Sequence, residues 1–125
     1  MKIGVILNTN EAESVWNCFR FGNEALKSGH MIKIFLLGKG VEIEDLKDDR
    51  FPLLEGSVKK FVKNKGIVLA CGTCLQIRQK GESRICPVST MEEMLIADQL
   101  NILDITQVGH IQGETKFHLY RLSVA

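Results

Sequence analysis

The chain has 125 residues, of which 45% are hydrophobic and 25% are charged, the composition of an ordinary globular domain. Its 16 Lys and Arg residues balance 15 Asp and Glu residues, and a net charge of +1 excludes a general basic surface for nucleic acid. No apolar run approaches the ~18 residues of a membrane-spanning helix. These features predict a single domain over residues 1–125 that has neither a nucleic-acid nor a membrane partner.

The N-terminal apolar run, residues 3–7, is shorter than the roughly 7–15 apolar residues of a secretory signal and indicates a strand instead. With no export signal, we expect the chain to be cytoplasmic. Thiols stay reduced in that compartment, so the four cysteines are not expected to form structural disulfides.

Apolar runs rich in β-branched residues predict buried strands. They lie at residues 3–7, 31–37, 67–70 and 102–105, and a further strand is predicted over 117–124. Residues 107–116 show no strong period.

Amphipathic stretches between these runs predict helices. The first ends near Lys27, the second begins near Pro52 and ends at Gly66, and the third runs from Met91 to about Asp98. Asn8, Thr9 and Asn10 offer N-cap chemistry for the first helix, as Ser89 and Thr90 do for the third. The charged stretch 42–50 predicts a short exposed helix or loop.

Strands that alternate with helices predict an α/β fold with a mainly parallel sheet covered on both faces. Right-handed crossovers place the carboxyl ends of parallel strands along one edge of the sheet. Ligands and catalytic groups gather at that edge. Residues that directly follow the predicted strands are therefore the candidates for function.

Two cysteines spaced as C-x-x-C follow the third predicted strand. Cys71 ends the strand, and Cys74 comes one helical turn later on the same face. The start of a helix stabilises an anion, so a thiolate is favoured here. Gly72 permits close approach of another molecule, and Thr73 offers a hydroxyl. Arg78, one turn beyond Cys74, can reach an anion near the site, so the segment describes an activated sulfur nucleophile.

Three interpretations of this segment remain open. The first is sulfur or redox chemistry, and the second is zinc binding with Cys86 as a third ligand. The third is a structural role, because buried cysteines often act as small hydrophobic residues. A thioredoxin-like arrangement is disfavoured, since its C-x-x-C follows the first strand of a βαβ unit. We expect no metal and no cofactor.

Three further candidates for this edge are Asn8, Thr9 and Cys86. Asn8 and Thr9 end the first strand and either line a pocket or simply cap the helix that follows. Cys86, in a predicted loop, is a candidate third thiol. Cys18 falls on the inward stripe of the first helix, which predicts a place in the core.

Residues 70–78, Ala-Cys-Gly-Thr-Cys-Leu-Gln-Ile-Arg, resemble the matching segment of the DsrE/DsrF-like family. This family includes YchN-like proteins and sulfur-relay subunits related to TusD. Supporting similarity lies in residues 2–8, 35–41 and 86–91, so the resemblance covers about residues 1–100. Residues 109–125 are longer than the usual end of the family and depart from it.

The resemblance implies a three-layer α/β/α fold and assembly into homotrimers or homohexamers. It also implies that Cys71 carries sulfur as a persulfide, taken from a donor protein and passed to an acceptor. Cys74 and Arg78 match the extended motif of the YchN-like branch, with Cys74 as the second thiol. The alternative is a metal-binding or structural oligomeric module whose C-x-x-C is not catalytic.

Overall fold

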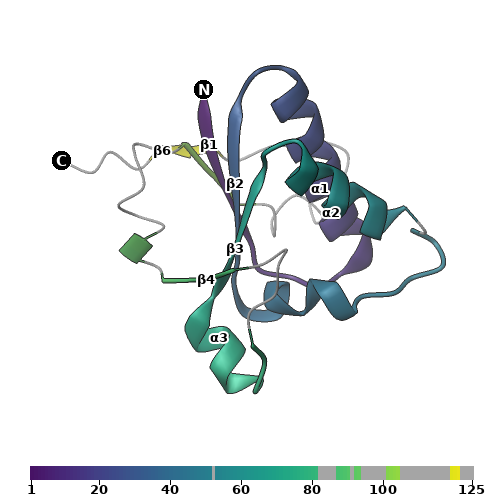
Figure 1. The fold of residues 1–125 in the computed structure, drawn as a ribbon, viewed down its shortest axis with the longest axis vertical. Coiled ribbons are helices and arrows are strands. Elements are labelled where there is room, and N and C mark those ends of the chain that lie inside the picture. Colours follow the sequence, from purple (N-terminus) through teal and green to yellow (C-terminus); the bar gives the residue numbers. More distant parts are fainter. Residues whose placement is uncertain (52, 82–86, 91, 94–100, 105–118, 122–125) are drawn as a thin grey trace.

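The computed structural model describes residues 1–51, 53–81, 87–90, 92–93, 101–104 and 119–121 (Figure 1). Six strands form one sheet in the order β4-β3-β2-β1-β5-β6, and all neighbouring pairs but β5 with β6 are parallel. The strands are β1 (Lys2–Leu7), β2 (Met31–Leu36), β3 (Ile67–Cys71), β4 (Val88–Ser89), β5 (Asn101–Asp104) and β6 (Leu119–Arg121). The predicted α/β fold with a mainly parallel sheet is confirmed.

Helices α1 (Ala12–Lys27) and α2 (Leu54–Lys63) pack against each other on one face of the sheet (Figure 1). A 3-10 helix, η1 (Gly38–Asp45), follows β2, and the short helix α3 (Gly72–Ile77) follows β3. Of the helix predicted over 91–98, only Glu92 and Glu93 are described, and both are helical. Within the described residues, no helix combines the length and apolarity that crossing a bilayer requires.

Three local expectations need correction. Strand β4 was not predicted, because two residues are too few to show a period. An exposed helix or loop was predicted over 42–50, whereas the helix η1 begins already at Gly38 and buries Val41 and Ile43 in the core. The N-cap of α1 is Glu11, whose longer side chain turns back onto the first turn, rather than one of the three residues before it.

The N-cap predicted for the helix over 91–98 is confirmed at Thr90. The Glu93 amide donates to Thr90 Oγ1 at 3.0 Å, and the Thr90 amide donates to Glu93 Oε2 at 3.2 Å. This reciprocal pair is a capping box, which satisfies amides that a helix start leaves open.

The main core lies between the sheet and helices α1 and α2. Alternate residues of β1, β2 and β3 face it, among them Val5, Ile34 and Val68. Cys18 is fully buried there, as predicted, and its burial raises the pKa of the thiol. It is therefore a core residue with no access for a reactant.

Phe61 is the fully buried centre of the contact between α1 and α2. Its ring meets Phe19 edge-on, with ring centroids 5.5 Å apart. Gly22 of α1 leaves the space that the ring occupies, because a Cβ there would lie 2.8 Å from Phe61 Cε2. The close packing of the two helices thus depends on the missing side chain at residue 22.

A pair of glycine substitutions tests this packing. Gly22→Ala should lower the free energy of unfolding by about 1–3 kcal/mol, because the added methyl overpacks a closed site. Gly56→Ala, in α2, adds a methyl that meets nothing within 4 Å and should raise it by ~0.5–1 kcal/mol through helix propensity. Chemical denaturation measures both, and a stabilising Gly22→Ala would contradict the packing described.

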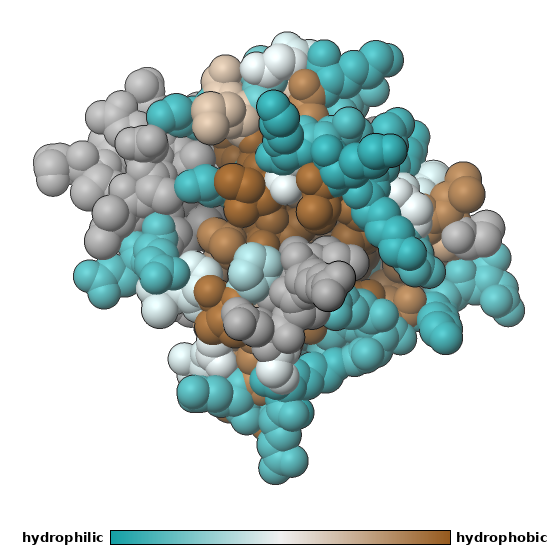
Figure 2. All heavy atoms as spheres, in the orientation of Figure 1, coloured by the Kyte–Doolittle hydropathy of each residue, from teal (hydrophilic) through white to brown (hydrophobic). Residues whose placement is uncertain are grey.

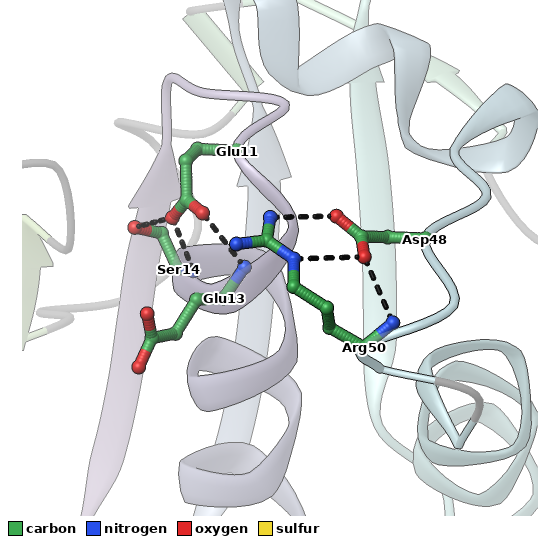
Figure 3. A network of polar contacts seen from close by, with 5 residues as sticks. All are labelled: Glu11, Glu13, Ser14, Asp48 and Arg50. Carbon is green, nitrogen blue, oxygen red and sulfur yellow. Dashed lines mark hydrogen bonds and ion pairs between the residues drawn. The ribbon is translucent and has the colours of Figure 1, made fainter.

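The start of α1 is held by a polar network (Figure 3). The Glu11 carboxylate accepts hydrogen bonds from the amides of Glu13 at 3.0 Å and Ser14 at 2.8 Å. Arg50 lies beside it and forms an ion pair with Asp48 at 2.8 Å. Desolvation opposes ionisation of Glu11, but the Ser14 and Glu13 hydrogen bonds and the Arg50 charge outweigh it and lower the pKa of Glu11.

This lowered pKa predicts a stability contribution that depends on pH. It is fully present above the ordinary pKa of 4.5 and is lost as the pH falls through the lower folded value. Glu11→Gln should therefore cost a few tenths of a kcal/mol at neutral pH, after solvent screening, and nothing in strong acid. Thermal melts of the wild type and of Glu11→Gln, from neutral pH to strong acid, measure the difference in stability between them. Glu24→Gln, at the far end of α1, should not show this pH-dependent loss of stability. A difference between wild type and Glu11→Gln that grows in acid would refute the stabilising role of the Glu11 carboxylate.

Candidate functional site

The two thiols lie at the junction of β3 with α3, at the lower end of the sheet in Figure 1. Cys71 is both the last residue of β3 and the N-cap residue of α3, with extended backbone angles. Its side chain makes no capping hydrogen bond and is only 4% exposed. It packs with Phe35 on the sheet face opposite to α1 and α2. This burial does not fit a first attack by Cys71 on a donor protein.

Cys74 is the more accessible of the two thiols. It is half-buried and packs against the small cluster that contains Phe35 and Cys71. The Gly38 amide donates a hydrogen bond to Cys74 Sγ at 3.3 Å. The backbone therefore supplies a hydrogen-bond donor to any negative charge that develops on this sulfur during a reaction.

A tight turn after β2 delivers this amide. Gly38 has a φ of 55°, a left-handed conformation that glycine adopts without strain. Asn8, at the end of β1, lies directly against Gly38, and a Cβ at residue 38 would collide with its side chain. The predicted site residue Asn8 thus contacts the turn that carries the donor.

Arg78 is tied into the scaffold beneath Cys74. Its Nε donates to Glu42 Oε1 at 3.2 Å, and its Nη1 donates to the Cys74 carbonyl at 3.2 Å. Asn10 Nδ2 donates to the other carboxylate oxygen of Glu42 at 2.9 Å. These bonds connect the end of β1, η1 and α3. Arg78 therefore holds the turn that carries Cys74, and its predicted reach to an anion near the site stays a prediction.

The other candidates have simpler places. Thr9 Oγ1 accepts from the Glu11 amide at 3.0 Å, so it holds the turn that leads to the N-cap residue Glu11 and does not cap α1 itself. Gly72 lies under β4, where a Cβ would be 3.1 Å from Val88 Cγ1. Thr73 is exposed on the first turn of α3. Cys86 lies outside the described residues.

Sequence reasoning missed Gly38, Glu42 and Asn10. A signal existed for Gly38, because the Gly-Lys-Gly segment follows a strand that neighbours β3 and must meet the same edge. None existed for Glu42, one of several acids in a charged stretch. Among the described residues, no three His, Cys, Asp or Glu side chains gather as metal ligands would.

No protein-family model matches the chain, and no curated protein matches it significantly. Solved structures do. The crystal structure of the ychN protein from E. coli covers 82% of this chain and 99% of its own, with a TM-score of 0.63 and 19% identity. The chain has the ychN fold. A conserved protein of unknown function from Bacteroides thetaiotaomicron, BT1422, has a TM-score of 0.64 and 17% identity over 82% of this chain and 93% of its own.

These similarities confirm the fold that the family resemblance implied. At 17% and 19% identity they concern the path of the backbone and not the chemistry. The function of this ychN-like chain is therefore argued from the geometry around Cys74.

The difference in burial predicts an order of alkylation. With iodoacetamide under native conditions, Cys74 should react first, because this residue is only partly buried and its sulfur accepts a hydrogen bond from the Gly38 amide. Cys71, at 4% exposure, and Cys18, at 0%, should react at least tenfold more slowly until urea unfolds the chain. Peptide mass mapping after timed quenching measures each cysteine separately, Cys86 included.

Cys74→Ser provides the control for that experiment. It should abolish the fast phase without speeding the labelling of Cys18. Labelling of Cys71 as fast as Cys74 in the native protein would refute the accessibility described.

Proposed function

We propose that this chain handles sulfur as a persulfide on the Cys71–Cys74 pair, with Cys74 as the thiol that meets the donor and Cys71 as the carrier. The observation that carries the proposal is the hydrogen bond of 3.3 Å from the Gly38 amide to Sγ of Cys74, a residue that is only partly buried. A backbone donor aimed at a reachable sulfur is what an activated thiol needs. The 4% exposure of Cys71 supports the second role, because a buried persulfide is shielded from cellular reductants.

The first step loads Cys74. Its thiolate attacks the outer sulfur of a donor persulfide, the sulfur–sulfur bond of the donor breaks, and the donor thiolate leaves. The product is Cys74 persulfide, with no net oxidation or reduction. The Gly38 amide favours the attacking thiolate before the step, and exposure of Cys74 admits the donor.

The second step moves the sulfur inward. The Cys71 thiolate attacks the outer sulfur of the Cys74 persulfide, and Cys74 leaves as a thiolate, which the Gly38 amide again stabilises. Attack on the inner sulfur instead forms a Cys71–Cys74 disulfide and releases hydrosulfide. The two residues are one turn apart and pack in one cluster, so both routes need only local movement.

Arg78 and Glu42 act in this scheme as positioning residues. Their ion pair, with side chains 24% and 33% exposed, holds η1 against α3. Since η1 begins at Gly38 and α3 contains Cys74, the pair keeps donor and sulfur at their bonding distance. Lys80 and Asp45 form a second ion pair between the same two regions.

The proposal extends to the setting. We expect the chain to work in the cytoplasm, where thiols stay reduced, with a donor protein and an acceptor protein as partners. Following the family resemblance, we expect a homotrimer or homohexamer.

Mass spectrometry of the intact protein tests the chemistry. After incubation with glutathione persulfide, the wild-type chain should gain the mass of one sulfur atom, removable by dithiothreitol. Cys74→Ser should load at least tenfold more slowly, because the buried Cys71 must then meet the donor itself. Cys71→Ser should load as fast as wild type but hold its sulfur on Cys74 and lose it faster to cyanide.

Cys18→Ser is the matched control, because it removes a fully buried thiol away from the site and should not alter loading. Equal loading of the double variant Cys71→Ser with Cys74→Ser would refute the proposal. No mass gain in the wild type would also refute it and would favour a structural role for both cysteines.

A further inference from the structure

A separate hollow lies at the opposite end of the sheet from the thiols. Its volume is about 330 Å³, and it is bounded by the amino ends of β1, β2 and β3 and the carboxyl ends of α1 and α2. Lys2, Met31 and Ile67, the first residues of the three strands, line it. Because Ile67 and Cys71 are the two ends of β3, about 13 Å of extended chain separates the hollow from the thiol site.

The floor of the hollow is apolar and reaches the surface. Leu26, Ile32, Met31 and Ile67 line it, and the last two are 57% and 40% exposed. Figure 2 shows that hydrophobic side chains also gather near the middle of the visible face of the molecule, with hydrophilic ones around them. When an apolar group covers a concave apolar surface that is open to water, the free energy of the system falls.

The charged residues of the hollow have one sign. Lys2, Lys33 and Lys65 line it together with the polar His30 and Asn64, and none of the described lining residues is acidic. The register pairs Lys33 of β2 with Ile67 of β3, so an ammonium group and an exposed apolar side chain are neighbours. The chain as a whole is nearly neutral, so this local excess of positive charge is not a general property of its surface.

The helix ends at the hollow do not oppose a negative ligand strongly. Carbonyl groups at a helix carboxyl end repel anions when they are left open. Here the last turn of α2 is closed, because Lys60, Val62 and Phe61 accept from the amides of residues 64–66 at 2.9–3.1 Å. The last turn of α1 is closed in the same way by the amides of residues 28–30.

We propose that this hollow binds a small organic anion, a carboxylate or sulfonate carried on an apolar body. The body would cover Met31 and Ile67, and the anionic group would face the ammonium groups of Lys33 and Lys65. Both parts of the ligand follow from the lining, since the floor selects the apolar body and the lysines select the charge. The site is independent of the proposed sulfur chemistry.

The probe for this site is anilinonaphthalene sulfonate, an aromatic anion whose fluorescence rises in an apolar site. It should bind the native protein saturably, octanoate should displace it, and raised salt should weaken it. Phenylnaphthylamine, an uncharged analogue, should bind more weakly and without dependence on salt.

Two lysine substitutions locate the binding. Lys33→Gln combined with Lys65→Gly should weaken sulfonate binding about fivefold to tenfold and leave the neutral probe unchanged. Glycine is chosen at residue 65 because the backbone there has a φ of 72°, which glycine adopts without strain, so the fold should tolerate the change. Lys59→Gln combined with Lys60→Gln removes the same charge from exposed positions of α2 outside the hollow and should bind as the wild type does.

Three results would overturn the proposal. The first is the absence of saturable binding by the native protein. The second is a sulfonate affinity of the Lys33 and Lys65 double variant equal to that of the wild type, and the third is a loss of affinity in the Lys59 and Lys60 double variant as large as that in the Lys33 and Lys65 variant. Thermal melts of both variants establish that each is folded. Ile67→Ser, which removes part of the floor, should weaken both probes, and unchanged binding there would also count against the site.

Discussion

The parallel register between β2 and β3 is the constraint on which the candidate site depends. Leu36, the last residue of β2, pairs with Ala70, one residue before the end of β3. The segments that follow the two strands therefore leave the sheet side by side. One turns sharply at Gly38 and the other opens α3, and the result is the hydrogen bond from the Gly38 amide to Cys74 Sγ. Neither segment alone provides both the sulfur and its donor.

Strand alternation explains why the two thiols differ. Val68 and Ala70 face the main core, so Leu69 and Cys71 face the other side of the sheet, where Phe35 packs beside Cys71. Cys74 leaves that layer because it sits one turn into α3 rather than in the strand. The C-x-x-C spacing thus places the buried sulfur of Cys71 beside the more accessible sulfur of Cys74. The proposed transfer between the two moves a reactive group from a solvent-accessible position to a buried one.

The sequence predicts well what depends on local pattern. Apolar runs locate β1, β2, β3 and β5, and helical spacing places Cys18 in the core, because burial imposes a period on each element. The contacts of Arg78 are different in kind. Its partner Glu42 is 36 positions away, and only the sheet order and the turn at Gly38 decide which acid it meets. The sequence supplies the arginine, and the tertiary fold decides whether it faces a ligand or a neighbour.

The same sheet presents opposite surroundings at its two ends. At the carboxyl end, the Gly38 amide donates to the Cys74 sulfur, and Arg78 forms an ion pair with Glu42. At the amino end, lysines surround exposed apolar side chains without a carboxylate among the described lining residues. A net charge of +1 averages over this difference, so composition excludes a general basic surface while leaving room for a local one. The two proposed activities therefore separate along the strands, with recognition by charge at the amino end and thiol chemistry at the carboxyl end.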